Sequence, residues 1–164
     1  MKKKIAILGS TGSIGKTLFN LILREKKNFE FSLLTAHKSH KILLKQAKAL
    51  NVKNLIITNK KDYEILKQKT KNSKIKVFND FTQLDKIFKK RIDYVMSSIS
   101  GIQGLEPTIK IIKFTKKIAI ANKESIICGW NLIQSQLNKH KTEFIPVDSE
   151  HFSIWYGLKN YKSK

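Results

Sequence analysis

The chain has 164 residues, of which 41% are hydrophobic, enough for one globular domain with a buried core. Its formal net charge is +21 at pH 7, which raises nucleic acid as a partner. Only Arg24 and Arg91 carry the guanidinium group that favours base and phosphate recognition, and the lysines are spread from Lys2 to Lys164. Ile and Asn are abundant and Ala is scarce, as in a chain whose codons are biased toward A and T. We therefore attribute most of the charge to coding bias and do not expect nucleic acid as the partner.

Cysteine content and the N-terminus indicate a cytoplasmic protein. Cys128 is the single cysteine, so an internal disulfide or a cysteine pair on a metal is excluded, and a reducing compartment fits. The apolar run that follows the basic start is only Ile5–Leu8, too short for a signal-peptide core or a membrane span. We expect no membrane association.

Short β-rich runs alternate with segments of helical period along the whole chain. The sequence predicts strands at 5–8, 29–36, 55–58, 75–78, 94–97, 117–121 and 144–147. It predicts helices at about 13–24, 39–50, 62–69, 82–89, 105–114 and 125–137, and a helix start at Ser149. In the first helix the expected apolar face is Ile14, Leu18, Leu21 and Ile22, and Ser39 is the expected cap of the second. Regular βα alternation predicts an α/β fold, a doubly wound, mostly parallel, Rossmann-like sheet with helices on both faces.

A glycine-punctuated turn, Gly9-Ser10-Thr11-Gly12-Ser13-Ile14-Gly15, joins the first strand to the first helix. Its glycines permit a tight turn, close approach of a pyrophosphate and close packing of helix on strand. The helix N-terminus offers unpaired N–H groups and partial positive charge to phosphates. The turn predicts a dinucleotide phosphate site, with a purely structural glycine turn as the alternative.

The second strand ends at Thr35-Ala36-His37-Lys38-Ser39, where an NAD-specific fold usually has an acid for the ribose 2′-hydroxyl. No acid is present, and Lys38 with His37 suits a 2′-phosphate. The alternative is a solvated lysine in a lysine-rich chain.

Two later motifs also follow predicted strands. In Ala121-Asn122-Lys123-Glu124-Ser125, an amide, an ammonium and a carboxylate gather, although Asn122 could simply cap a helix with Glu124 in its first turn. In Pro146–His151, Asp148 and Glu150 stand two apart, and in an extended segment both would face one side as hard oxygen ligands for Mg²⁺ or Mn²⁺. A helix start capped by Asp148 or Ser149 is the alternative there.

The three motifs at 9–15, 121–125 and 146–151 together resemble 1-deoxy-D-xylulose 5-phosphate reductoisomerase of the non-mevalonate isoprenoid pathway. The order, spacing and strand-end placement agree over essentially the whole chain. The resemblance implies NADPH, a divalent metal, Mg²⁺ or Mn²⁺, a phosphorylated sugar substrate and a homodimer. It implies rearrangement of 1-deoxy-D-xylulose 5-phosphate at the metal, followed by reduction to 2-C-methyl-D-erythritol 4-phosphate.

The resemblance also implies roles for individual residues. Contacts to NADPH fall to Thr11, Gly12, Ser13, Ile14, His37, Lys38, Ser39, Asn122 and Glu124. Metal ligands are Asp148 and Glu150, with Lys123 and Ser149 on substrate, and Lys123, Ser149 and Glu150 form the catalytic set. The chain departs from the family at His37 and Ser39, where glycine and asparagine are usual.

Length is a further departure, since family members are more than twice as long. The resemblance assigns a third acidic metal ligand, a mobile flap, most phosphate-holding groups and a helical domain to segments beyond position 164. We therefore expect residues 1–164 to form the NADPH-binding, Rossmann-like domain, catalytically incomplete by itself. The alternative is a nucleotide-binding module that works only with a separate C-terminal part.

Overall fold

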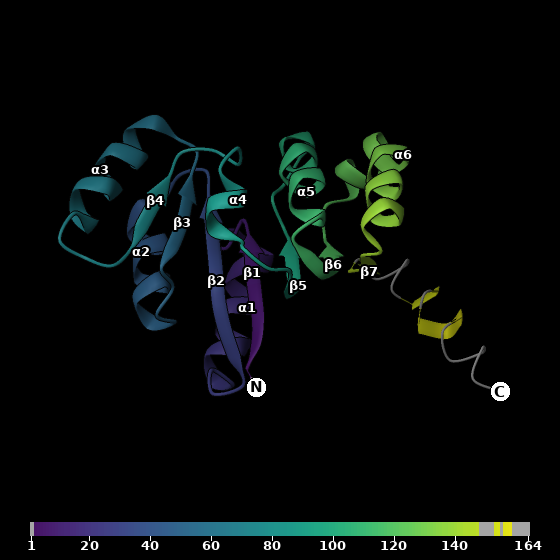
Figure 1. Ribbon diagram of the computed structural model, residues 1–164, viewed down its shortest axis with the longest axis horizontal. Coiled ribbons are helices and arrows are strands. Elements are labelled where there is room, and N and C mark those ends of the chain that lie inside the picture. Colours follow the sequence, from purple (N-terminus) through teal and green to yellow (C-terminus); the bar gives the residue numbers. More distant parts are fainter. Residues whose placement is uncertain (1, 148–152, 155, 159–164) are drawn as a thin grey trace.

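The computed structural model describes residues 2–147, 153–154 and 156–158. They form a single parallel sheet with helices against both faces (Figure 1). The strands are β1 Lys3–Leu8, β2 Phe29–Ala36, β3 Asn54–Ile57, β4 Lys76–Phe78, β5 Ile92–Ser97, β6 Thr115–Ile120 and β7 Glu143–Pro146. Their order is β4-β3-β2-β1-β5-β6-β7, and every pair is parallel. The predicted doubly wound α/β fold is confirmed.

Six helices and one 3-10 turn connect the strands within the described residues. The helices are α1 Ser13–Arg24, α2 His40–Ala49, α3 Lys60–Thr70, α4 Leu84–Ile87, α5 Leu105–Ile112 and α6 Lys123–His140. The 3-10 turn, η1 Ile102–Gly104, leads into α5. The strand and helix order is the predicted one, while the predicted helix start at Ser149 lies outside the described residues.

Two apolar cores lie on opposite faces of the sheet. One combines strand residues such as Ile7 and Leu34 with Ile22 of α1, Leu43 of α2 and Leu66 of α3. The other combines the alternate strand residues with side chains of the helices that follow β4, namely Leu84, Phe88, Ile111, Ile133 and Leu137. Because successive strand side chains point to opposite faces, strands covered on both sides carry the nearly continuous apolar runs seen in the sequence.

The buried face of α1 differs from the predicted one. Ile22 is buried and Leu18 packs against the core, but Leu21 is 57% exposed and Ile14 is 42% exposed. At 100° per residue, the buried side is turned roughly 60° from the predicted face, toward Gly15 and Phe19. The reason is the close contact of Gly15 with the β1–α1 turn, which fixes the rotation of the helix independently of its apolar pattern.

The fourth helix is shorter than predicted, since only Leu84–Ile87 is helical. Before it, Asp80 Oδ1 accepts bonds from the Thr82 backbone N–H (2.7 Å) and hydroxyl (2.5 Å), which holds a bend. After it, Phe88 is extended and packs on Phe114 with ring centroids 5.5 Å apart. A local side-chain turn and a tertiary contact thus override the helical pattern.

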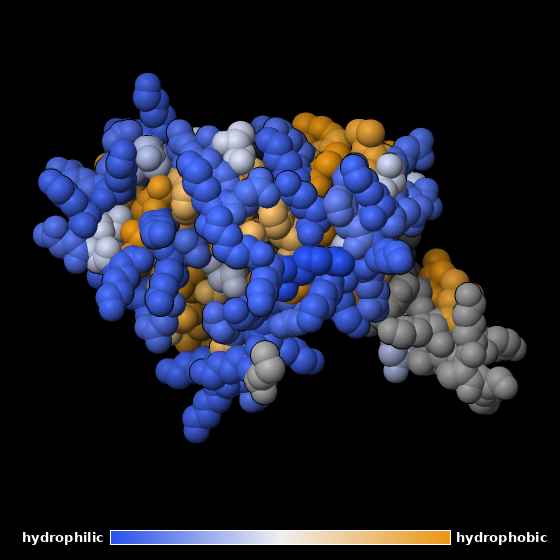
Figure 2. Space-filling model, viewed as in Figure 1, coloured by the Kyte–Doolittle hydropathy of each residue, from blue (hydrophilic) through white to orange (hydrophobic). Residues whose placement is uncertain are grey.

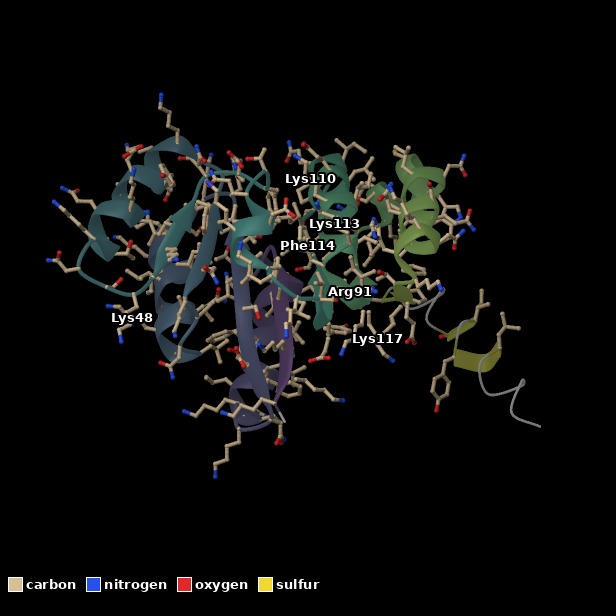
Figure 3. All side chains as sticks on the ribbon, viewed as in Figure 1. Lys48, Arg91, Lys110, Lys113, Phe114 and Lys117 are labelled. Carbon is tan, nitrogen blue, oxygen red and sulfur yellow. The ribbon has the colours of Figure 1, made fainter. Side chains whose placement is uncertain are left out.

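The surface is mostly hydrophilic on the face shown in Figure 2. The basic side chains labelled in Figure 3 come from separate elements, including Lys48 of α2, Lys110 of α5 and Lys117 of β6. Several lysines pair with acids, as Lys116 does with Asp93 (2.8 Å) and Lys117 with Glu143 (2.7 Å). Among the described helices, none combines the length and apolar character needed to cross a membrane.

Gly15 gives a test of the helix–turn contact. A Cβ at Gly15 would lie 2.3 Å from the Gly9 carbonyl oxygen, whereas a Cβ at Gly12 would lie 3.3 Å from the same atom. We expect Gly15→Ala to lower the free energy of unfolding by about 1–3 kcal/mol, because the backbone itself must move. Gly12→Ala is the matched control and should cost clearly less in urea unfolding. Equal losses in the two variants would contradict the proposed contact.

Candidate dinucleotide site

The candidate site lies at the carboxyl ends of β1 and β5. Strand order runs outward in one direction from β1 through β2 to β4 and in the other from β5 to β7. The reversal between β1 and β5 opens a crevice above their ends, where ligands bind in doubly wound sheets. The glycine turn after β1 and the segment Ser98–Ser100 after β5 border this crevice.

Glycine is required at the first position of the turn. Gly9 has φ +77°, and a Cβ there would lie 2.7 Å from the backbone oxygen of Ser98. The Gly12 N–H donates to the Gly9 carbonyl at 3.0 Å, which closes the turn onto α1. Both the left-handed backbone and the approach to β5 therefore exclude a side chain at position 9.

Polar side chains from the second βα unit hold the turn in place. The Gly9 N–H donates to Thr35 Oγ1 at 2.9 Å and the Ser10 N–H donates to the Thr35 carbonyl at 2.8 Å. The Ser10 hydroxyl donates to Gln46 Oε1, and Gln46 Nε2 donates back to the Ser10 carbonyl, both at 2.8 Å. Sequence reasoning missed Thr35 and Gln46, although a glutamine within the apolar face of α2 is a detectable signal.

The start of α1 carries N–H groups that the described part of the chain leaves without a partner. The backbone N–H groups of Thr11, Ser13 and Ile14 donate to no acceptor among the described residues. Gly12, Ser13 and Ile14 are exposed. The N–H groups of Ser13 and Ile14 are among the donors that any helix leaves unsatisfied in its first turn, and that of Thr11 lies in the turn just before the helix. No acidic residue occupies the first turn of α1, so the helix dipole faces solvent.

A cleft of about 710 Å³ runs from this turn across the ends of β2 and β3 to α5. Its far wall is polar, with Asp80 and Thr82 from the β4–α4 segment and Glu106 and Lys110 from α5. The hydrogen bonds from Thr82, with the nearby charge of Lys110, hold the pKa of Asp80 below its usual value of 3.8. Glu106 and Lys110 form an ion pair at 2.6 Å. The full lining includes Gly9, Thr11, Gly12, Thr35, Ala36, His37, Thr58, Asn79, Phe81, Ser98, Ile99, Ser100, Gln103 and Pro107.

The segment after β2 reaches this cleft through His37, whose Nδ1 lies 2.8 Å from Thr58 Oγ1. Lys38 and Ser39 are exposed. Ser39 precedes α2, but its side chain makes no capping hydrogen bond and its backbone is left-handed, with φ 68°. Ser39 occupies the N-cap position of α2, but the prediction that its side chain caps the helix is wrong. The left-handed backbone does not orient the hydroxyl toward the helix N–H groups.

Asn122 is a structural clamp. Its Oδ1 accepts from the Ser125 N–H at 2.8 Å and so caps α6, while its Nδ2 donates to the carbonyls of Gly101 (2.7 Å) and Ile99. The capping alternative drawn from the sequence is confirmed, and Glu124 lies in the first turn of α6 as that alternative required. Asn122 is buried, whereas Lys123 and Glu124 are exposed beside it. The roles of these three residues toward cofactor and substrate stay predictions.

The predicted metal site falls on residues that the structure does not describe. Asp148, Ser149 and Glu150 fall between the described residues Val147 and Ser153. Within the described ranges, no group of three or more His, Cys, Asp or Glu side chains could hold a metal ion. Pro146 is paired with Ile120, so the carboxyl ends of β7 and β6 lie side by side.

A doubly wound sheet with a glycine turn at its crevice defines the dinucleotide-binding class of α/β proteins. Within that class, a family model described as 1-deoxy-D-xylulose 5-phosphate reductoisomerase matches residues 5–129. The chain belongs to this family.

Individual relatives agree with this assignment. The reductoisomerase of Pelagibacter ubique is 59% identical over 162 residues, covering 98% of this chain and 42% of the relative. The structure of the Zymomonas mobilis reductoisomerase in complex with NADPH superposes with a TM-score of 0.83 at 32% identity, covering 92% of this chain and 40% of that one. A reductoisomerase structure in complex with NADPH, fosmidomycin and magnesium gives a TM-score of 0.82 at 28% identity, covering 91% and 37%. The chain thus spans about two fifths of the length of the relatives it matches.

The Asn122 clamp generates a testable expectation. Asn122→Ala removes the α6 cap and both bonds to the loop at 99–101, and we expect a loss of about 2 kcal/mol or more of unfolding free energy. Asn122→Asp retains the capping oxygen but faces the two carbonyls with an acceptor, so it should not rescue stability. Chemical denaturation of both variants measures this, and an aspartate variant as stable as wild type would show that the amide donor is unimportant.

Proposed function

We propose that this chain forms the NADPH-binding part of a 1-deoxy-D-xylulose 5-phosphate reductoisomerase. The enzyme would use NADPH and a divalent metal to convert 1-deoxy-D-xylulose 5-phosphate into 2-C-methyl-D-erythritol 4-phosphate. The observation that carries the proposal is the unpaired helix N-terminus at the crevice, in a chain of the reductoisomerase family. The relatives' structures in complex with NADPH and with magnesium support both cofactors.

The residues at the crevice fit a dinucleotide phosphate group. Two N–H groups at the start of α1 and that of Thr11 just before it have no acceptor among the described residues, and Gly12 brings no side chain between them and solvent. Two phosphates carry the acceptor oxygens and negative charge that such a helix end binds. Thr11, Gly12, Ser13 and Ile14 would hold the pyrophosphate.

The segment after β2 fits the 2′-phosphate that distinguishes NADPH from NADH. Residues 37–39 contain no carboxylate, and the exposed Lys38 ammonium can attract a phosphate dianion. His37 lines the cleft next to Thr58, so an imidazole lies at the end of the cleft that the segment after β2 borders. When bound, NADPH supplies the hydride for the reduction step.

Asn122, Lys123 and Glu124 would act at the nicotinamide end of the cofactor. The buried Asn122 fixes the loop at 99–101, and Ile99 and Ser100 of that segment line the cleft. Lys123 would reach substrate and Glu124 the cofactor, with Asp148 and Glu150 as metal ligands and Ser149 on substrate. Lys123, Ser149 and Glu150 make up the proposed catalytic set.

A catalytically incomplete NADPH-binding module is the second candidate. The 164 residues span 42% of the Pelagibacter relative. Both candidates require the NADPH site, so nucleotide binding tests that site for both. Catalytic turnover distinguishes one candidate from the other.

Cofactor preference is the direct test. We expect the chain to bind NADPH more tightly than NADH, and Lys38→Ala to reduce NADPH affinity about tenfold while leaving NADH nearly unchanged, since only NADPH offers a charged partner. Lys41→Ala, one exposed lysine further on, is the matched control. Fluorescence titration of the wild type and the two variants with each cofactor gives the six Kd values. Equal wild-type affinity for both cofactors would refute the proposed 2′-phosphate site.

Turnover separates the two candidates. The resemblance gives the metal a third acidic ligand from beyond position 164, and losing one preorganised electrostatic group commonly costs a factor of ~10²–10³. We therefore expect no measurable NADPH oxidation by the 164-residue chain with 1-deoxy-D-xylulose 5-phosphate and Mg²⁺ or Mn²⁺. Turnover in the presence of a C-terminal part, abolished by Asp148→Asn or Glu150→Gln, would support the reductoisomerase. Robust turnover by the chain alone would refute the incomplete module.

A further inference from the structure

The start of α2 is held by a side chain from the neighbouring βα unit. Asp62 lies in the first turn of α3, where its own N–H donates to Asn59 Oδ1 at 3.1 Å. Its Oδ1 accepts from the His40 backbone N–H at 3.3 Å and from His40 Nδ1. Asp62 therefore supplies to α2 the acceptor that Ser39 does not, and it does so across two elements.

The pair is largely shielded from solvent. The His40 side chain is 15% exposed and that of Asp62 is 19% exposed. The hydrogen bond from the His40 side chain is the main reason that the pKa of Asp62 lies below its usual value of 3.8, and the charge of Lys38 acts in the same direction. Asp62 thus acts as a carboxylate on the backbone two residues after Lys38, the candidate 2′-phosphate residue.

The backbone between His37 and His40 needs this support. Ser39 has φ 68° and ψ 46°, a left-handed conformation that costs a residue with a Cβ roughly 1–2 kcal/mol. Contacts to the β3–α3 segment hold both ends, with the Asn59 N–H donating to the His37 carbonyl at 2.8 Å and Asp62 binding His40. Lys38 therefore sits on a short strained segment pinned on each side.

We propose that the His40–Asp62 pair positions the segment that carries Lys38 and so supports the preference for a 2′-phosphate at this site. Asp62 fixes this segment through the backbone N–H and the Nδ1 of His40. This inference rests on the proposed NADPH site and adds two positioning residues, neither of which the sequence motifs indicated.

The test measures the ratio of the Kd values of the full chain for NADH and NADPH, which differ only in the 2′-phosphate. His40→Ala removes the Nδ1 bond to Asp62, and the preference for NADPH should fall roughly three- to fivefold, because the segment that carries Lys38 is held less firmly. His40→Asn, whose amide nitrogen can replace Nδ1 as donor, should retain most of the preference. Asp62→Ala, which removes the acceptor of both His40 donors, should lower the preference at least as far as His40→Ala does.

Outcomes separate this inference from the proposed function. A wild-type chain without preference overturns the 2′-phosphate site and the pair's role together. A wild-type preference that His40→Ala leaves unchanged, or an equal loss for both cofactors, overturns the role of the pair alone. His40→Phe, which keeps a ring without the donor, serves if the alanine variant does not fold.

Hydrogen exchange provides a readout that needs no cofactor. In Asp62→Ala, the amides of His40–Leu43 should exchange faster than in wild type, because the cross-element cap is lost. Asp62→Asn retains an acceptor and should protect them. Unchanged exchange in Asp62→Ala would show that the carboxylate does not hold the segment.

Discussion

The close contact between the β1–α1 turn, the start of α1 and the end of β5 is the constraint on which this structure depends. At Gly15 the helix backbone approaches the Gly9–Ser10 backbone so closely that a Cβ would lie 2.3 Å from a carbonyl oxygen. At Gly9 the turn approaches Ser98, just after β5, so that a Cβ would lie 2.7 Å from the Ser98 backbone oxygen. These contacts direct the N-terminus of α1 to the crevice between β1 and β5, and a larger residue at either position would move it away.

Local pattern was enough to predict the order and type of the elements but not the orientation of α1 or the length of α4. In Phe29–Ala36 the apolar residues stand at 29, 31, 33, 34 and 36, a pattern typical of a strand, so its bounds could be predicted to the residue. The apolar pattern of α1 is broad, and a backbone contact at Gly15 selected one rotation from those it permits. The region of α4 has a helical pattern that the Asp80–Thr82 turn and the packing of Phe88 override.

The candidate site shows the same division. Residues on short motifs, the glycine turn and the segment after β2, could be found from the sequence because the chemistry needs them close together in the chain. The partners of Thr35, Gln46 and Asp62 could not, since each of these residues acts on a residue from another element. Only the strand order brings such pairs together, and the spacing of residues in the chain carries no record of it.

Asn122 shows that a capping role and a site role need not be alternatives. Its amide caps α6 and also bonds the loop carbonyls at Ile99 and Gly101, so it ties the start of α6 to the segment after β5. A Cβ at Gly104 would lie 2.4 Å from the same amide nitrogen, so η1 packs directly against it. Because Ile99 lines the cleft, the buried amide shapes the crevice without facing it. A buried side chain can therefore contribute to a binding site without contacting the ligand. Asn122 does so through its hydrogen bonds to backbone groups, which hold the loop that lines the cleft.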